Sequence, residues 1–133
     1  MVDAHGVPLA TLLTAANVND SRVLADVLDA IPPIHRPRGR PRRRPAKLHA
    51  DKGYDIPRCH GELRARRILD RIARKEVDSS RRLGRHRWVV ERTGAWFNRY
   101  RRLRVRDERR EDIHQAFVSL ASALILFRYL HRN

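Results

Sequence analysis

Five prolines stand between residues 32 and 45, and they constrain the fold of this chain more than any other feature of its sequence. Proline lacks a backbone N–H and fixes φ, so neither a helix nor a central strand can pass through this segment. Arginines at positions 36, 38, 40, 42, 43 and 44 keep the same segment in water. We therefore predict a solvated basic Pro/Arg loop over 32–46, inserted into a single domain of 133 residues.

The charge of the chain is concentrated after this loop begins. Residues 1–35 contain four acids and one arginine, a net charge of −3. Residues 36–133 hold 29 basic and 11 acidic groups, a net charge of +18, which brings the whole chain to +15. A basic protein of this kind attracts polyanions, and an acidic protein partner is a weaker second choice. We expect the partner to be nucleic acid.

The cysteine content, the N-terminus and the longest apolar stretch indicate the cellular compartment. The single cysteine, Cys59, excludes an internal disulfide and a multi-cysteine zinc cluster, which is typical of a reducing compartment. The N-terminus carries Asp3 and lacks the pattern of a secretory signal. The apolar stretch around 116–127 contains serines and is expected to be too short for a membrane span. We expect a soluble, cytoplasmic protein with no membrane partner.

Hydrophobic periodicity and turn residues predict an α/β fold. The first 14 residues are typical of a β-hairpin with its turn at Gly6. The later expectations are a helix capped by Asp20 or Ser21 and ending at Ile31, a strand over 46–51, a helix from Pro57 to Arg66 or Arg67, a strand over 68–73, a polar loop through Ser79 and Ser80, a helix over 85–100 and a final helix. The predicted order is β β α, basic loop, β α β α α.

The apolar residues of the two C-terminal helices are expected to lie in the core. Apolar residues recur at helical spacing in both of them, which predicts one buried face on each helix. The expected stripe of the final helix is Ile113, Ala116, Phe117, Leu120, Ala121, Leu124 and Phe127, and the aromatic residues expected in the preceding helix are Trp88, Trp96 and Tyr100.

Two acids are candidates for chemistry, and each has an ordinary structural alternative. Asp51 closes a predicted strand, and in open α/β sheets ligands gather beyond the carboxyl ends of strands. Its alternative role is a turn aspartate that accepts bonds from the amides of Lys52 or Gly53. Glu91 lies in the middle of a predicted helix, where an ion pair with Arg87 one turn earlier is the alternative. Spacing alone favours the structural role for both acids.

Longer strings around these acids carry a resemblance. They read Ala-Asp-Lys-Gly-Tyr-Asp at 50–55, Arg-Trp-Val-Val-Glu-Arg at 87–92 and Arg-Arg-Leu-Arg-Val-Arg at 101–106, together with Val-Asp-Ala-His-Gly-Val-Pro-Leu at 2–9 and Leu-Thr-Ala-Ala-Asn-Val-Asn-Asp at 13–20. With the basic loop, these strings resemble the C-terminal half of bacterial insertion-sequence DDE transposases over essentially the whole chain. The resemblance implies a ribonuclease-H-like fold and a three-carboxylate site that binds Mg²⁺ or Mn²⁺.

The match implies roles for individual residues. Asp51 takes the place of the second catalytic aspartate, Glu91 that of the catalytic glutamate, and Arg87 that of the arginine one turn before it. Gly84 and Asn98 stand where the family has a tyrosine and a lysine, and Arg99 or Arg101 is a substitute for the lysine. The central first strand and its aspartate lie upstream of Met1 in the family. We therefore expect an incomplete domain that is inactive alone.

Contact with DNA is expected at cations of the loop and of the matched strings. These residues are Arg38, Arg40, Arg42, Arg43, Arg44, Lys52, Arg101 and Arg102. The partners implied are DNA and an upstream transposase fragment or a second copy of the chain. The rival hypothesis is a basic nucleic-acid-binding or assembly protein without catalysis, which explains the charge equally well but not the strings at 50–55 and 87–92.

Overall fold

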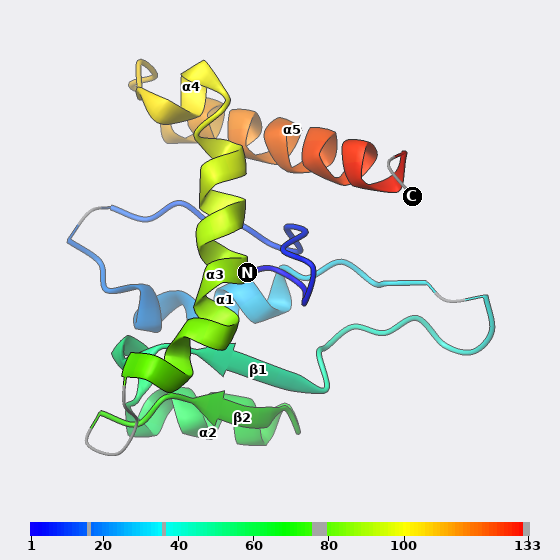
Figure 1. Ribbon diagram of the computed structural model, residues 1–133, viewed down its shortest axis with the longest axis vertical. Coiled ribbons are helices and arrows are strands. Elements are labelled where there is room, and N and C mark those ends of the chain that lie inside the picture. The colour runs from blue at the N-terminus through cyan, green and yellow to red at the C-terminus, as the bar shows by residue number, and fades with distance from the viewer. Residues whose placement is uncertain (16, 36, 76–79, 132–133) are drawn as a thin grey trace. The chain divides into compact units, whose positions relative to one another are not determined.

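The computed structural model describes residues 1–15, 17–35, 37–75 and 80–131, and within its long third helix it describes side chains from Trp88 onward. The elements are η1 (Asp20–Val23), α1 (Leu24–Asp29), β1 (Lys47–Ala50), η2 (Lys52–Tyr54), α2 (Pro57–Ala65), β2 (Leu69–Ile72), α3 (Ser80–Phe97), α4 (Arg101–Arg104) and α5 (Glu111–Leu130). The mixture of helices and strands confirms the α/β class (Figure 1). The chain divides into two compact units, Thr14–His86 and Met1–Leu13 with Arg87–Asn133.

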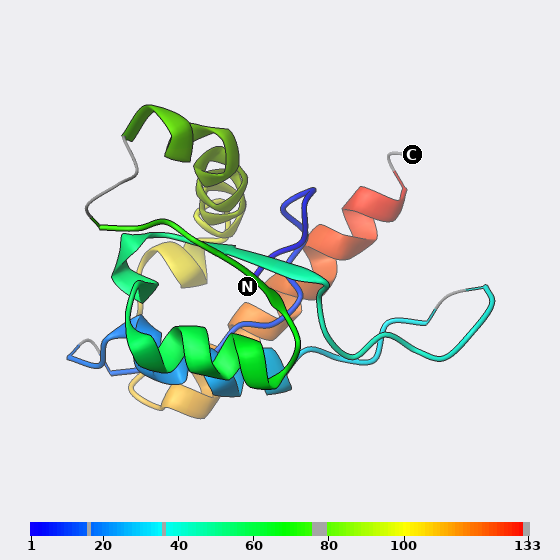
Figure 2. The same cartoon turned by 90° about the horizontal axis from the view of Figure 1, so that it is seen from below.

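The unit Thr14–His86 is built on a parallel pair of strands. Lys47 lies opposite Leu69 and Ala50 opposite Ile72, so β1 and β2 end at the same edge. A parallel pair needs a crossover connection, and α2 supplies it along one face of the sheet (Figure 2). Leu63 and Cys59 of α2 are the largest fully buried side chains among the described residues. The predicted strand, helix, strand order over 46–73 is therefore confirmed.

The helical segment before the loop begins differently from the prediction. A 3-10 turn, η1, precedes α1, and the capping residue is Asn19 rather than Asp20 or Ser21. The Asn19 side chain accepts a hydrogen bond from the Ser21 amide at 3.0 Å, a local bond that amide side chains make readily. Leu24, Leu28 and Ile31 form the buried apolar face of this segment.

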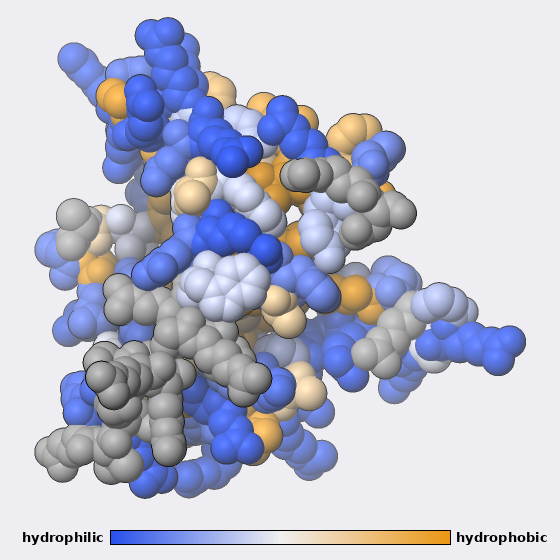
Figure 3. All heavy atoms as spheres, viewed as in Figure 1, coloured by the Kyte–Doolittle hydropathy of each residue, from blue (hydrophilic) through white to orange (hydrophobic). Residues whose placement is uncertain are grey.

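The described residues of the basic Pro/Arg loop contain neither a helix nor a strand. In the described part of 32–46 the backbone makes an isolated bridge between Ile34 and Arg42, and the Ala46 carbonyl at the end of the loop accepts the Leu69 amide at 2.9 Å. The loop projects away from the rest of its own unit in both ribbon views, and its arginines form a hydrophilic projection in Figure 3. Prolines and mutually repelling cations explain why no helix or strand forms in its described part.

The predicted N-terminal hairpin is wrong in extent. The turn forms, since the Gly6 amide bonds to the Asp3 carbonyl at 3.1 Å and Gly6 has a φ of +79°. The arms make only an isolated antiparallel bridge between Val2 and Pro8. Pro8 has no N–H with which to extend a ladder, so no strand develops from the bridge.

The long helix α3 begins before the predicted boundary. It starts at Ser80 rather than at residue 85, and the rest of the predicted polar loop, residues 76–79, lies outside the described residues. Trp88 was expected in the core, but its side chain is 49% exposed. The Arg92 guanidinium lies over the rings of Trp88 and Trp96, at 4.5 and 5.0 Å from their centroids. Trp88 thus covers a cation instead of filling a core.

The predicted buried stripe of α5 is right at Ala121 and wrong at most of its other positions. His114, Ala121 and Ile125 form the buried face, whereas Leu120, Leu124 and Phe127 are 57%, 38% and 58% exposed. Apolar residues occur on several sides of this helix, so polar contacts decide which side faces the unit. Gln115 makes these contacts through bonds with the Leu13 amide and the Thr11 carbonyl at 3.1 and 3.0 Å.

The length of α5 corrects a second expectation. The helix has 20 residues and a mean hydropathy of 1.4, so it is long and apolar enough to cross a membrane. This property rests on length and composition alone, among the described residues. One such helix is weak evidence for a membrane span. The polar contacts of Gln115 and the burial of His114 instead tie one face of α5 to its own unit.

Candidate catalytic and nucleic-acid-binding residues

Asp51 follows β1 directly and begins the next turn. It caps η2, and its Oδ1 accepts a hydrogen bond from the Gly53 amide at 2.8 Å. A Cβ added to Gly53 would lie 3.0 Å from that oxygen, so a glycine fits this turn closely. The predicted structural role of Asp51 as a turn aspartate is therefore present. Its side chain is exposed, and a carboxylate bonded to one amide still has acceptor capacity for another ligand.

The surroundings of Asp51 are those of a strand end. Both parallel strands finish here, since the Ala73 amide after β2 bonds to the Ala50 carbonyl at 3.0 Å. Tyr54, in the same turn, is half-buried. Burial raises the pKa of Tyr54 to about 12, and the carboxylates of Asp20 and Asp51 add to the rise. The phenol of Tyr54 thus stays protonated at neutral pH beside the exposed carboxylate of Asp51.

A histidine bridge holds the turn after Asp51 to the sheet. The His60 ring bonds to Asp55 at 3.0 Å through Nε2 and to Asp70 through Nδ1. Hydrogen bonds with Asp70 and Asp55 raise the pKa of His60. Asp55 also accepts the Lys75 amide at 2.9 Å, and this bond and the one to His60 lower its pKa. The last residue of the string at 50–55 therefore fixes the geometry of its own turn.

Glu91 lies in α3, in the part that belongs to the other unit, and its side chain is exposed. The next two residues tie this turn of the helix to the N-terminal segment. The Thr93 hydroxyl donates to the Gly6 carbonyl at 2.6 Å and is buried, while Arg92 donates to the His5 carbonyl. A Cβ on Gly6 would come within 3.0 Å of the Thr93 hydroxyl. The string at 2–9 thus packs against the helical turn that carries Glu91.

The convergence of Asp51 and Glu91 stays a prediction, because the two residues belong to different units. The side chain of Arg87 lies outside the described residues, so its ion pair with Glu91 is also untested. Within the described residues, no group of three or more His, Cys, Asp or Glu side chains could hold a metal ion. Asp3 serves its own turn, with Oδ1 accepting the amides of His5 and Val7 at 2.8 Å each.

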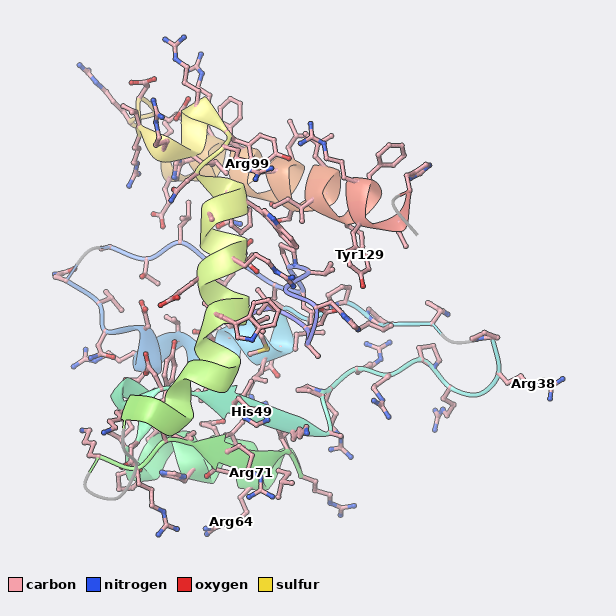
Figure 4. All side chains as sticks on the ribbon, in the orientation of Figure 1. Arg38, His49, Arg64, Arg71, Arg99 and Tyr129 are labelled. Carbon is pink, nitrogen blue, oxygen red and sulfur yellow. The ribbon has the colours of Figure 1, made fainter. Side chains whose placement is uncertain are left out.

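The cations expected to contact DNA differ in how far they are already engaged. Arg38, Arg40, Arg42 and Arg43 are exposed on the loop, and Figure 4 shows Arg38 pointing outward from it. Arg44 donates to the Arg66 carbonyl at 2.7 Å. Arg101 and Arg102 lie in α4, and Arg102 is paired with Glu108 at 2.9 Å. Lys52 lies in η2. The four outer loop arginines and Arg101 are the exposed members of this set whose side chains have no partner among the described residues.

Comparison with known proteins places these residues in a family. The family model described as a transposase DDE domain matches residues 1–126. The chain belongs to the transposase DDE domain family. A curated relative named "Putative transposase for insertion sequence element IS402", from Burkholderia cepacia, is 50% identical over 132 residues, which are 99% of this chain and 63% of the relative. No solved structure matches.

The family match confirms the resemblance drawn from the strings at 50–55 and 87–92. DDE transposases typically use divalent metal ions. This DDE chain spans less than two thirds of the length of the IS402 relative.

Sequence reasoning missed the residues that shape the surroundings of the two acids. His60, Asp70 and Thr93 are such residues. The contact of His60 with Asp70 joins positions 10 residues apart, and that of Thr93 with Gly6 joins positions 87 residues apart. Asp55 carried a signal, because it belongs to the string that includes Asp51. No spacing rule links Thr93 to Gly6, since the contact depends on tertiary packing.

Proposed function

We propose that this chain is part of a DDE transposase that binds DNA and, when complete, catalyses metal-dependent phosphodiester cleavage and strand transfer in DNA transposition. Asp51 and Glu91 are the two carboxylates of the site that this chain contains, and Arg87 is the arginine that accompanies Glu91. The position of Asp51 carries the proposal. It is an exposed carboxylate at the common end of two parallel strands, in a chain that belongs to the DDE family.

Asp51 suits a divalent ion by its chemistry. Mg²⁺ and Mn²⁺ prefer carboxylate oxygens, and the turn holds one oxygen of Asp51 with a single amide bond. The ion held here would take one of the two tasks that a pair of ions shares, activating the attacking oxygen or steadying the leaving oxygen of the phosphodiester. The residues of this chain would hold the ion through Asp51 and Glu91, and the bond to Gly53 would keep the Asp51 side chain oriented.

We further propose that both units belong to one truncated domain of ribonuclease-H-like topology. β1 has only β2 as a neighbour among the described strands, so its other edge is open. An open edge pairs readily with another strand. The missing central strand, with the first aspartate, would pair there, and the chain would be inactive without it. The greater length of the IS402 relative supports a longer complete protein. We expect it to work in the cytoplasm, with an upstream fragment or a second copy as partner.

The test supplies the missing strand. A polypeptide with the first strand and its aspartate, taken from the longer IS402 relative, is added to the chain together with a DNA duplex carrying the ends of the element. We expect Mg²⁺-dependent strand cleavage that is lost in Asp51→Asn and in Glu91→Gln, and kept in Asp3→Asn. DNA binding without cleavage in every combination would instead favour the non-catalytic basic protein.

A further inference from the structure

A hollow of about 610 Å³ opens within the unit Thr14–His86, beside the turn that begins at Asp51. Gly53, which follows β1, and Lys75, which follows β2, both line it. The hollow therefore lies where the two parallel strands end. Its other walls come from η1 and from the start of α2.

Three cations line this hollow, and none of its described lining residues is acidic. The cations are Arg22, Arg58 and Lys75, and the side chains of all three are exposed. The side chain of Arg22 makes no hydrogen bond or ion pair with a described residue, so it is available to a ligand. Three positive charges around one concave surface predict an anionic ligand.

Arg58 is held in place before any ligand arrives. Its Nη1 donates to the Arg22 carbonyl at 3.0 Å and its Nη2 donates to the Ser21 carbonyl at 2.7 Å. A guanidinium has five N–H donors, so these two bonds orient the group and leave donors for a ligand. Planar guanidinium groups match the spacing of phosphate oxygens. The volume of the hollow also exceeds the need of a single monatomic ion.

The hollow shares one residue with the candidate catalytic turn. Gly53 lines it, and the Gly53 amide holds the carboxylate of Asp51. An anion bound here would lie next to Asp51 rather than at the distant tip of the basic loop. At this position, one phosphate of a DNA strand would bind in the hollow, and the next phosphodiester linkage of the same strand would lie at the carboxylate of Asp51.

We propose that this hollow binds a backbone phosphate of DNA, with Arg22, Arg58 and Lys75 as its contacts. The proposal rests on the proposed function, because it takes the phosphate to belong to the DNA on which the transposase acts. It assigns a positioning task to residues outside the basic loop. The loop would hold DNA loosely, and the hollow would set which phosphate lies beside Asp51.

The first arm of the test uses inorganic phosphate and the full chain, followed by amide NMR. Phosphate should shift the amide signals of Ser21, Arg22, Gly53 and Lys75. The variant Arg22→Ala with Lys75→Ala should lose these shifts, and it leaves the Arg58 bonds intact. The control Arg64→Ala with Arg71→Ala removes the same charge from exposed positions on α2 and β2 (Figure 4) and should keep them. Equal shifts in all three proteins would overturn the proposal.

The second arm measures the affinity for a short DNA duplex against salt concentration. Loss of one phosphate contact flattens the slope of log K against log salt by about 0.9, so the Arg22/Lys75 variant should show this change relative to the control pair. Phosphate could shift the amide signals around the hollow while the Arg22/Lys75 variant and the control pair give the same slope for DNA. In that case the site binds free phosphate and the DNA assignment is wrong. Neither arm needs metal or cleavage, so failure of the cleavage test leaves both results interpretable.

Discussion

The two units of the chain bury apolar side chains to different degrees. In the unit Thr14–His86, Leu63 and Cys59 of α2 are fully enclosed, with side chains that are 0% and 1% exposed. In the other unit, α5 buries Ala121 and Ile125 but leaves Leu120, Phe127 and Leu130 more than half exposed. The unit that carries Asp51 thus has a closed core, whereas the unit that carries Glu91 relies on a helix with an open apolar side.

The difference shows how polar contacts choose a face where hydrophobicity does not. α5 is apolar on several sides, and Gln115 ties one of them to the N-terminal segment through Leu13 and Thr11. α2 has few apolar residues, so Leu63 and Cys59 have only one possible core. A helix with a narrow apolar face is placed by its sequence, and a helix with a broad one is placed by its neighbours.

Matched leucine truncations test this contrast and should give the largest effect. Leu63→Ala and Leu120→Ala remove the same atoms from helices, so differences in helix propensity cancel. Leu63→Ala should lower the free energy of unfolding by about 2–5 kcal/mol because it opens a cavity. Leu120→Ala should change it by less than about 0.5 kcal/mol. Thermal and urea unfolding measure both, and an equal loss in the two variants would mean that the open side of α5 is packed in solution.

The cations of the two units should also differ in their contribution to DNA binding. Replacing Arg38, Arg40, Arg42, Arg43 and Arg44 by alanine removes up to five phosphate contacts, so the slope of log K against log salt should flatten by about 4. Arg101→Ala with Arg102→Ala should flatten it by less than about 2, since Glu108 already pairs with Arg102. Fluorescence anisotropy with a labelled duplex measures the slopes. An unchanged slope in the loop variant would exclude the loop as a contact surface.

A smaller effect is expected from pH in the unit that contains His60. Hydrogen bonds with Asp70 and Asp55 raise the pKa of His60, so its contribution to stability is full below the unfolded pKa of about 6.5 and is lost as pH rises through the folded pKa. The contribution should be below about 1 kcal/mol, as for partly exposed ion pairs.

The opposite sign holds on the acid side. Hydrogen bonds with the Lys75 amide and His60 lower the pKa of Asp55, so its contribution to stability is lost as pH falls through that lowered value.

Urea unfolding of the parent and of His60→Gln between pH 5 and pH 8 tests the contribution of His60. The difference in the free energy of unfolding between the two proteins should shrink with rising pH. A constant difference would show that His60 acts through packing alone.

Sequence patterns predicted the parts of the fold that depend on residues close together in the sequence. The strand before Asp51, the helix from Pro57 and the loop of prolines follow from alternation, a helix-starting proline and the loss of N–H donors. The exposed Trp88 and the open side of α5 could not be foreseen, because contacts with Arg92 and Gln115 decide them. In the site, Asp51 was identified from the string at 50–55. Arg22, Arg58 and Lys75 line one hollow but belong to no common sequence motif, so the sequence did not bring them together.

If Asp51 and Glu91 share one divalent ion, as we propose, paramagnetic broadening by Mn²⁺ should report the ion at both residues. Substoichiometric Mn²⁺ is added to the ¹⁵N-labelled chain, and the amide signals of Gly53 and Arg92 report on the two carboxylates. We predict that both signals broaden in the parent, that Asp51→Asn or Glu91→Gln removes the broadening at both, and that Asp3→Asn keeps it. Broadening that each substitution removes only at its own residue would contradict a shared ion.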